Sequence, residues 1–506
     1  MIYPRLFWKN DHRPWPAPST CSGPGPLGAL FLLGTIALLS SCSKPTQPVL
    51  AITHVTVIDA SSAPPQPDMT LLIADQRIAA IAPSKSIRIP PNAQILDASG
   101  KFLIPGLADM HVHLTGANEP AGSREFIIPL LLANGITTVR DMGGYLESLF
   151  PLRKDIEQGK RLGPQITFAG PYLDGNPPSF QPSFVVTNAV EASEDVHSLI
   201  QRGVDFIKVQ SILSRDAYFA IADVCRREHI TFVGHVPDRV TAAEASDAGQ
   251  KSIEHLTGVL RACSKDEPRL MREQFLTTPK KESRAQSHAR QLAWQRELLT
   301  HYSEEVADEL IAKFDRNQTW QVPTLILLRN NAFPTPENDP ANDPRRKYVP
   351  HQFLETWQKT HQAQMNSATP REFALRVALM EKSMHVVGKM QLAGVHLMAG
   401  TDTTAPFVFP GSALHEELAL LVQSGLTPMQ ALQAATKNPA EFLGKLQTQG
   451  TIEQGKFADL LLLDANPLHN IHNTQKIRAV ILRGTLLDRN HLDGLLAAAE
   501  KFAAMN

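Results

Sequence analysis

Short apolar segments alternate with longer amphipathic segments through the middle of this 506-residue chain. The apolar segments have the length of buried strands and the others have helical spacing, an order typical of parallel βα units. Eight such units predict an α/β fold of the closed (β/α)8 type, a TIM barrel, with its chemistry at the carboxyl ends of the strands. The expected strands are residues 102–111, 136–141, 165–169, 205–210, 230–235, 252–255, 319–325 and 396–402.

Strand patterns also occupy both ends of the chain. The first group is residues 52–59, a hairpin over 69–81 and a strand at 93–96; the second is 450–455, 458–463 and 479–483. We predict that 51–103 and 447–490 build one small composite β-sandwich beside a barrel domain of 104–446. Residues 491–506 are expected to form a C-terminal helix.

Two connections in the barrel region are much longer than ordinary loops. They are the charged, helix-like segment 257–318 and the segment at about 330–370, which begins rich in Pro, Asn and Asp. Both leave from the face that carries the strand ends, so they are candidate lids over a site. Surface decoration is an equally open interpretation.

The first 41 residues have the pattern of an export signal. Arg5, Lys9 and Arg13 precede a thirteen-residue apolar run, 27–39, which is too short to span a bilayer comfortably. The run ends in Leu-Ser-Ser-Cys, which resembles a bacterial lipobox with Cys42 as the lipidated residue. We therefore expect a lipoprotein signal peptide (1–41), a tether (42–50) and a lipid anchor at the periplasmic face of the outer membrane. A plain transmembrane anchor and an ordinary signal peptide are the alternatives.

The composition is that of a globular protein, with 43% hydrophobic and 20% charged residues and a net charge of −1. Such a charge gives no electrostatic sign of nucleic-acid binding, and none is expected. After the expected processing only Cys225 and Cys263 accompany Cys42. That count excludes a disulfide scaffold, although a single bridge stays open.

Candidate chemistry lies at the expected strand ends. His111 and His113 are two residues apart, so in a strand their side chains leave the same face. The pair alone is weak evidence in a chain with 18 histidines. Four further polar residues stand at or in the ends of other expected strands: Lys208, His235, His255 and Asp402. Since burying a lysine ammonium is costly, Lys208 in an apolar strand requires partners. Together the six residues predict one site.

These residues stand in segments that resemble the amidohydrolase superfamily, in its imidazolonepropionase-like and Xaa-Pro-dipeptidase-like branch. The segments are 105–113 (PGLADMHVH), 135–141 (GITTVRD), 234–236 (GHV), 253–255 (IEH), 399–402 (AGTD), 434–440 and 450–460. The resemblance runs from about residue 52 to 487. It is specific for the superfamily and much less so for a substrate.

The resemblance implies a ligand set for two divalent metal ions. His111, His113 and Asp402 would hold the more buried ion, and His235 and His255 the second. Lys208 would carry a carbamate that bridges both. Nitrogen and oxygen ligands suit zinc, with manganese, iron or cobalt as alternatives. The implied reaction is hydrolysis of amide, peptide or cyclic-amide bonds, with Asp402 as the catalytic proton carrier.

Substrate contacts are expected from loops after the third, fifth and seventh strands. The candidates are Tyr172, Asp174, Arg239 and Thr324, around a small molecule or short peptide-like substrate. Arg239 would clamp a carboxylate, unless it is a solvated loop charge. Segment 169–178 lacks the Gly-Gly-His-Gly-like stretch that we associate with the dipeptidase and ochratoxin-hydrolysing members, which argues against a dipeptide ending in proline.

Three nearby polar positions are assigned structural roles. Arg140 and Asp141 are expected to form an ion pair, His396 to lie in the core, and His415 to occupy an ordinary helix position. Alternatives to the two-metal hydrolase are a mononuclear deaminase-type or lactonase-type relative, and a non-catalytic binding lipoprotein. The presence of Lys208 argues against the first and the complete ligand set against the last. A homo-oligomer stays open.

Overall fold

The structure is a computed structural model that describes residues 49–115, 122–275, 283–332, 342–367 and 369–506. It separates into two units, 1–44 and 45–506, and only the second contains described residues. The expected signal peptide, Cys42 and most of the tether lie outside the described residues. Across the described ranges, no helix combines the length and apolar character needed to span a bilayer.

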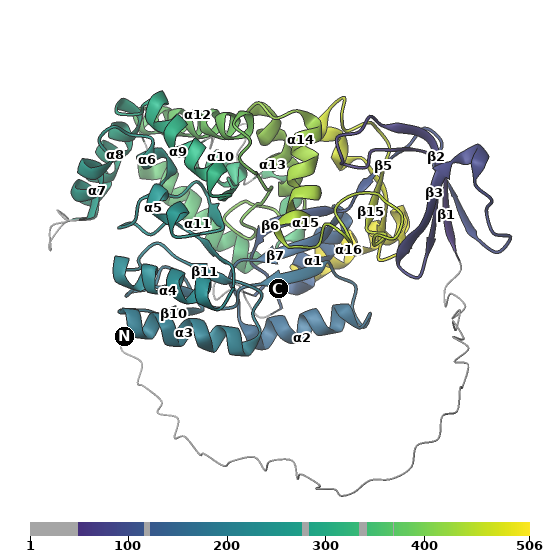
Figure 1. Ribbon diagram of the computed structural model, residues 1–506, viewed down its shortest axis with the longest axis horizontal. Coiled ribbons are helices and arrows are strands. Elements are labelled where there is room, and N and C mark those ends of the chain that lie inside the picture. The colour runs from purple at the N-terminus through teal and green to yellow at the C-terminus, as the bar shows by residue number, and fades with distance from the viewer. Residues whose placement is uncertain (1–48, 116–121, 276–282, 333–341, 368) are drawn as a thin grey trace, which may run out of the picture. The chain divides into compact units, whose positions relative to one another are not determined.

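Strands from both ends of the chain share one eight-stranded sheet, ordered β17-β16-β15-β5-β1-β2-β3 with β4 paired to β1. The N-terminal strands are β1 (Leu50–Val57), β2 (Gln66–Ala74), β3 (Arg77–Pro83), β4 (Gln94–Asp97) and β5 (Phe102–Pro105). The C-terminal strands are β15 (Leu460–Leu463), β16 (Ile477–Leu482) and β17 (Thr485–Leu487). The antiparallel β5–β15 pair joins the two groups, which lie side by side in Figure 1.

Apolar side chains explain that pairing. Ile52, Leu71, Leu103 and Leu462 are fully or almost fully buried together in one cluster. The expected strand at 450–455 is wrong, because these residues form turns that include two glycines with positive φ. The sandwich packing and its boundaries stay predictions.

The central strands are parallel and form two sheets. One sheet is β6 (Leu107–Val112), β7 (Ile136–Asp141) and β8 (Gln165–Phe168). The other has the order β10-β9-β11-β12-β13-β14, with β9 (Tyr172–Asp174), β10 (Ser183–Val185), β11 (Ile207–Val209), β12 (Phe232–Gly234), β13 (Ser252–Glu254) and β14 (Trp320–Val322). Seven of the eight expected strands therefore overlap observed ones in a mixed α/β fold, and β9 and β10 were not expected.

The eighth expected strand, 396–402, is not regular. Its strand pairing is limited to isolated parallel bridges, Leu397 to Gln321 and Thr403 to Val112, although further backbone hydrogen bonds join it to β6. Asp402 has a φ of 63°, which ends the extended backbone there. The segment still runs between β14 and β6, but the paired strands do not form one closed ladder.

Helices cover these strands (Figure 1). Between the strands run α1 (Arg124–Ala133), α2 (Leu146–Glu157), α3 (Ala189–Arg202), α4 (Arg215–Arg227) and α5 (Ala242–Asp247). The two long connections fold into α6 (Val259–Ala262), α7 (Glu267–Phe275), α8 (Arg284–Thr300), α9 (Glu304–Arg316), α10 (Leu325–Ala332), a 3-10 turn (Pro344–Tyr348), α11 (His351–Ser367) and α12 (Pro370–Leu392). The last group is α13 (Ser412–Gln423), α14 (Pro428–Ala434), α15 (Lys437–Phe442) and α16 (Arg489–Met505).

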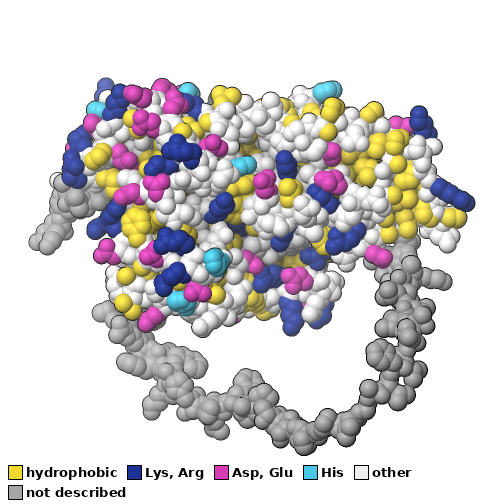
Figure 2. Space-filling model, viewed as in Figure 1, with side chains coloured by type: hydrophobic (Ala, Val, Ile, Leu, Met, Phe, Trp, Pro, Cys, Tyr) yellow, Lys and Arg dark blue, Asp and Glu magenta, His cyan; other side chains and the backbone are white. Residues whose placement is uncertain are grey.

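The sequence accounts for these helices locally. In α4 the buried residues Ala217, Ile221 and Val224 recur at helical spacing, and the Ser214 hydroxyl caps the first turn. The expected C-terminal helix is α16, which packs on α1 through a stacked Phe126–Phe502 pair with ring centroids 6.3 Å apart. On the face drawn in Figure 2, basic and acidic side chains are interspersed over the helices.

Candidate metal centre

Three of the expected ligands meet in one cluster. His111 lies in β6, His113 follows its end, and Asp402 ends the irregular segment hydrogen-bonded beside it. The Oδ1 atom of Asp402 lies 3.4 Å from Nε2 of His111 and 3.2 Å from Nε2 of His113. One ligand atom from each residue fits within 4.8 Å of the others, a spacing that suits a shared cation.

The other two histidines adjoin this cluster. The ring centroids of His111 and His255 are 4.5 Å apart, and those of His255 and His235 are 5.0 Å apart. Burial, reinforced by neighbouring positive charge, lowers the pKa of His111 and of His235 well below the usual value, and burial also lowers that of His255. Neutral imidazoles are the form that binds metal ions.

Lys208, in β11, lies among these residues. Its side chain is 1% exposed, and its Nζ has no hydrogen-bond partner among the described residues. Burial lowers the pKa of Lys208 to about 8, against the opposing pull of the carboxylates of Glu254 and Asp402. A buried amine without a partner is unusual, and its lowered pKa makes the free base accessible near neutral pH.

Each of the four histidines is oriented through its Nδ1 atom by a protein oxygen, an arrangement common around metal ligands because it directs Nε2 toward the ion. The pairs are His111 with Oε2 of Glu254 (2.9 Å), His113 with the carbonyl of Gly143 (3.1 Å), His235 with Oγ of Ser211 (2.8 Å) and His255 with Oγ1 of Thr324 (2.7 Å).

A buried charge network lies behind the cluster. Nη2 of Arg140 donates to both carboxylate oxygens of Glu254, at 2.9 and 3.0 Å, and Oγ of Ser252 donates to Oε1 at 2.5 Å. Arg140, Ser252 and Glu254 are all fully buried. The expected Arg140–Asp141 ion pair is therefore wrong, because Asp141 instead accepts the backbone N–H groups of Leu114 and Gly143.

Glu254 is the functional residue that sequence reasoning missed. It holds His111 on one side and Arg140 on the other. A signal was present, since a glutamate in the short strand before His255 is a charge in an expected interior position, and buried charges are rarely unpaired. What the sequence did not indicate was the identity of the partners, which lie 114 and 143 residues away.

The four candidate substrate contacts separate in the structure. Tyr172 is buried, with its hydroxyl 3.1 Å from Nδ1 of His113, and Thr324 contacts His255 in the same supporting way. Asp174 is buried, and its carboxylate accepts hydrogen bonds from the backbone N–H groups of residues 175, 179 and 212. It therefore stabilises the loops around it. Arg239 is exposed, and its neighbour Asp238 lines the adjoining cavity instead.

Two other histidines lie outside the cluster. His396 stacks on Trp320 with ring centroids 4.3 Å apart. His415 is buried in α13, where its ring nitrogens lie 2.9 Å from Oγ1 of Thr474 and 3.0 Å from the carbonyl of Asn134. His415 therefore belongs to the packing of its helix, whereas His396, expected in the core, is only half-buried.

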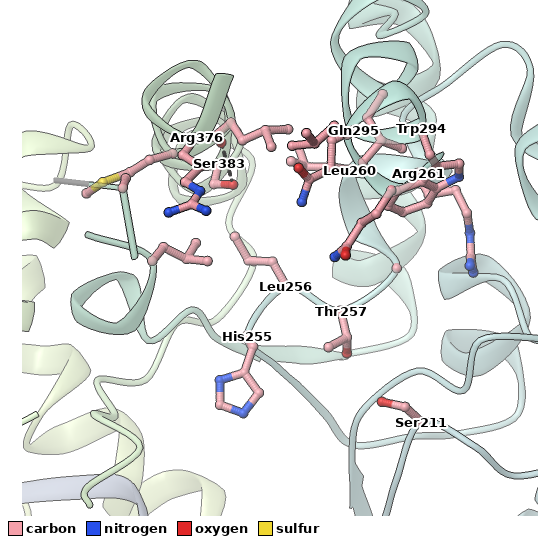
Figure 3. A pocket seen from close by; sticks show the side chains of 18 of the residues that line it. Ser211, His255, Leu256, Thr257, Leu260, Arg261, Trp294, Gln295, Arg376 and Ser383 are labelled. Carbon is pink, nitrogen blue, oxygen red and sulfur yellow. Dashed lines mark hydrogen bonds between the residues drawn. The ribbon is translucent and has the colours of Figure 1, made fainter. Parts of the chain in front are cut away.

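A cavity of about 1450 Å³ adjoins the centre. His255, Leu256 and Thr257 border it at the strand end, and side chains of α8, α11 and α12 form much of the remaining wall. Figure 3 shows His255 on one side of this space, with Trp294 and Gln295 of α8 and Arg376 of α12 across it. The long connections therefore help to build the cavity beside the centre.

Residues 102–487 match the amidohydrolase family. Among solved structures, a protein of Bifidobacterium longum provisionally assigned as a prolidase is 25% identical with a TM-score of 0.64, covering 89% of this chain and 99% of that one. Bottromycin amidohydrolase is 22% identical with a TM-score of 0.70, over 90% of this chain and 91% of that one. The latter likeness shows the fold alone.

Curated relatives match over shorter stretches. Adenine deaminase of Paracoccus denitrificans is 36% identical over 74 residues, which are 14% of this chain and 12% of that protein. Ochratoxinase of Aspergillus niger is 37% identical over 90 residues, 17% of this chain and 18% of that protein. The chain thus matches less than a fifth of either relative's length. Hydrolytic enzymes that act on carbon–nitrogen bonds recur among the relatives and structural neighbours.

Proposed function

Because the chain belongs to the amidohydrolase family, we propose that it hydrolyses the carbon–nitrogen bond of an amide, peptide or cyclic amide with two divalent metal ions. One observation carries the proposal: the Nζ atom of Lys208 is buried without a hydrogen-bond partner among the described residues, beside four histidines and Asp402. Such an amine becomes satisfied if carbon dioxide adds to its free base and releases a proton, because the carbamate formed offers two oxygens to two cations.

The donor set fits this assignment. His111, His113 and Asp402 would hold one ion, His235 and His255 the other, and the carbamate on Lys208 would contact both. Zinc suits these nitrogen and oxygen donors, with manganese, iron or cobalt as alternatives. Bound cations would polarise the scissile carbonyl and lower the pKa of a water molecule at the site.

The chain's own residues supply orientation and proton transfer. Burial opposes ionisation of Asp402, but the hydrogen bond with His113 and the charge of His255 and Lys208 hold the pKa of its carboxyl below the usual value. An ionised Asp402 can accept the proton of the attacking water at Oδ1 and return it to the departing nitrogen. Glu254 and Thr324 keep His111 and His255 in place through contacts with the Nδ1 atoms of the two rings.

We further propose that β6–β8, β11–β14 and segment 396–403 form the eight positions of a (β/α)8 barrel, and that the terminal strands form a composite domain beside it. Export with lipid attachment at Cys42 is proposed on the sequence pattern alone. Replacing Cys42 with Ser should move the protein from the membrane fraction of the producing bacterium to a soluble one. Unchanged membrane recovery would exclude this anchor.

The two-metal proposal is tested by metal analysis together with hydrolysis assays on dipeptides, N-acyl amino acids, lactams and lactones. We expect two ions per chain in the native protein and turnover of an amide class. Lys208→Ala should hold at most one ion and lose activity. The control is Lys101→Ala, which changes a lysine just before β5 that pairs with Asp464, and it should alter neither the metal content nor the activity. Two ions and full activity in Lys208→Ala would exclude the bridge.

A one-ion deaminase is the second candidate, because His111, His113 and Asp402 form a sufficient site for a single ion and short stretches match adenine deaminases. The same metal analysis separates the two. One tightly bound ion with ammonia release from adenine would support the deaminase, whereas two ions without ammonia release would exclude it.

A further inference from the structure

The cavity beside the metal centre has an unpaired cation in its wall. Arg376 lines the cavity from α12, and its Nη1 atom is buried without a hydrogen-bond partner in the part of the chain that the structure describes. Among the described residues no carboxylate forms an ion pair with this side chain. Figure 3 shows its guanidinium pointing from α12 into the space that His255 borders. The residue as a whole is half-buried, but a buried Nη1 donor without an acceptor is unfavourable, so this position favours an anionic ligand.

Positively charged side chains also outnumber negatively charged ones in the rest of the wall. Arg261 and Lys359 also line the cavity, and Asp238 is the sole acidic side chain among the lining residues. Arg261 is already occupied, since it donates to the carbonyls of Asp238 and Val240 at 3.1 and 2.7 Å. Burial raises the pKa of Asp238 to about 6, so its carboxylate is still ionised at neutral pH, where the charge of nearby Arg261 offsets it. Of the two arginines in the wall, Arg376 is therefore the one left for a ligand.

Apolar side chains form a large part of the remaining wall, among polar ones. Leu256, Leu292, Leu298 and Met380 are buried residues that line the cavity. The indole N–H of Trp294, on α8 and across the cavity from Arg376, also lacks a hydrogen-bond partner within the described ranges. Two unpaired donors in a leucine-rich wall suit a ligand with a polar acceptor head and an apolar body.

We propose that this cavity selects amphipathic acids: Arg376 binds the carboxylate of the substrate, and the leucine-lined wall holds its aliphatic body. This inference rests on the proposed function for the reacting end, which places the scissile amide beside His255. Arg376 lies on α12, the helix that follows the second long connection, rather than on a strand-end loop, so the specificity would reside in this helix. A guanidinium matches the planar geometry of a carboxylate.

Binding of octanoate and octanamide, which have equal chain length, tests the inference independently of catalysis. Calorimetry on metal-loaded and metal-stripped protein should show octanoate binding at least about tenfold tighter than octanamide, as expected for a charge-assisted contact. Arg376→Gln should weaken octanoate about tenfold or more and leave octanamide unchanged. Arg376→Lys, which keeps the charge but loses the planar fork, should fall between. Lys359→Gln, a change to a 79% exposed cation of the same wall, should have no effect.

Three outcomes would overturn the inference. They are equal affinity for octanoate and octanamide, octanoate binding that is insensitive to Arg376→Gln, and octanoate binding that disappears when the metal is removed. The last would place the carboxylate on the metal ions. If Arg376→Gln does not fold, the acid–amide comparison and Arg376→Lys still decide.

Kinetics separate this inference from the proposed function. With an N-acyl amino acid and its carboxamide as substrates, Arg376→Gln should raise KM for the acid and leave kcat largely intact. Octanoate binding through Arg376 without turnover of any amide would exclude the hydrolase proposal and keep the acid site. Turnover that is equal for the acid and its carboxamide and unchanged in Arg376→Gln would exclude the acid site and keep the hydrolase proposal.

Discussion

Glu254 holds a metal-ligating histidine without being placed to bind metal itself. Its carboxylate joins His111 and Arg140, all three being almost completely buried. We predict that Glu254→Gln lowers the free energy of unfolding by roughly 3 kcal/mol or more, because Arg140 loses its buried counter-charge. Metal affinity should fall about 10- to 100-fold, as expected when a histidine loses its orienting carboxylate. Urea unfolding and chelator competition measure the two effects.

Ser252→Ala is the matched control, since it removes a hydroxyl from the same network and leaves the charge pair intact. A cost of about 1 kcal/mol is expected, with metal affinity nearly unchanged. If Glu254→Gln bound metal as tightly as Ser252→Ala does, the orienting role of Glu254 would be wrong.

His415 predicts a pH dependence that does not involve the metal centre. Burial lowers the pKa of its imidazole from 6.5 to about 4. Above pH 6.5 the ring is neutral in both folded and unfolded chains, so its full stability is present there. As the pH falls from about 6.5 to 4 the unfolded chain takes up the proton first, and roughly 3 kcal/mol of stability is lost.

Unfolding measured at pH 7.5 and pH 4.5 in wild type and His415→Gln checks this. The variant should lose less stability than wild type between these two pH values, because a glutamine side chain takes up no proton. Equal losses in both proteins would show that His415 contributes no such pH dependence.

At the scale of elements, one glycine fixes how closely segment 396–403 approaches its neighbours. A Cβ added at Gly400 would lie 2.6 Å from Cγ1 of Val322 in β14 and 2.9 Å from Cβ of His111 in β6. Gly400→Ala should therefore cost about 1–3 kcal/mol of stability and weaken metal binding by displacing His111. Gly494 in α16 meets nothing within 4 Å, so Gly494→Ala should stabilise by about 0.5–1 kcal/mol. Thermal unfolding with and without zinc measures the stability and the metal binding of both variants against wild type.

The elements were predictable where local pattern decides them. Apolar runs located β6, β7 and β11–β14, because buried parallel strands are near-continuous in hydrophobic residues. The eighth position escaped this reasoning, since the left-handed backbone of Asp402 depends on neighbours distant in sequence. For the site, histidine spacing and strand-end positions indicated the ligands. The partner of Arg140 and the supporting contacts of Tyr172 and Thr324 arise only from tertiary packing.

At the scale of the whole molecule, the C-terminal segment is part of the structure that carries the site. Leu461 approaches Gly135 so closely that a Cβ there would lie 2.2 Å from its Cδ2 atom. Asp459 accepts the N–H of Gly106 through its carbonyl and the side-chain amide of Gln165 through its carboxylate. Gly106 lies just before β6 and Gln165 begins β8. The C-terminal segment therefore supports β6, which carries His111, and the neighbouring strands of its sheet.

We predict that a chain ending at Leu446 does not fold, because β5 loses its neighbour β15 and α1 loses α16. Burial of the four leucines of β15 alone is worth several kcal/mol, at about 1.5–3 kcal/mol for each buried side chain, which is comparable with the net stability of a domain. Solubility, circular dichroism and zinc content of the truncated protein measure this. Removing only the exposed residues 504–506 is the control and should leave all three unchanged. A soluble, zinc-binding chain ending at Leu446 would show that the strand region is independent of the C-terminal segment.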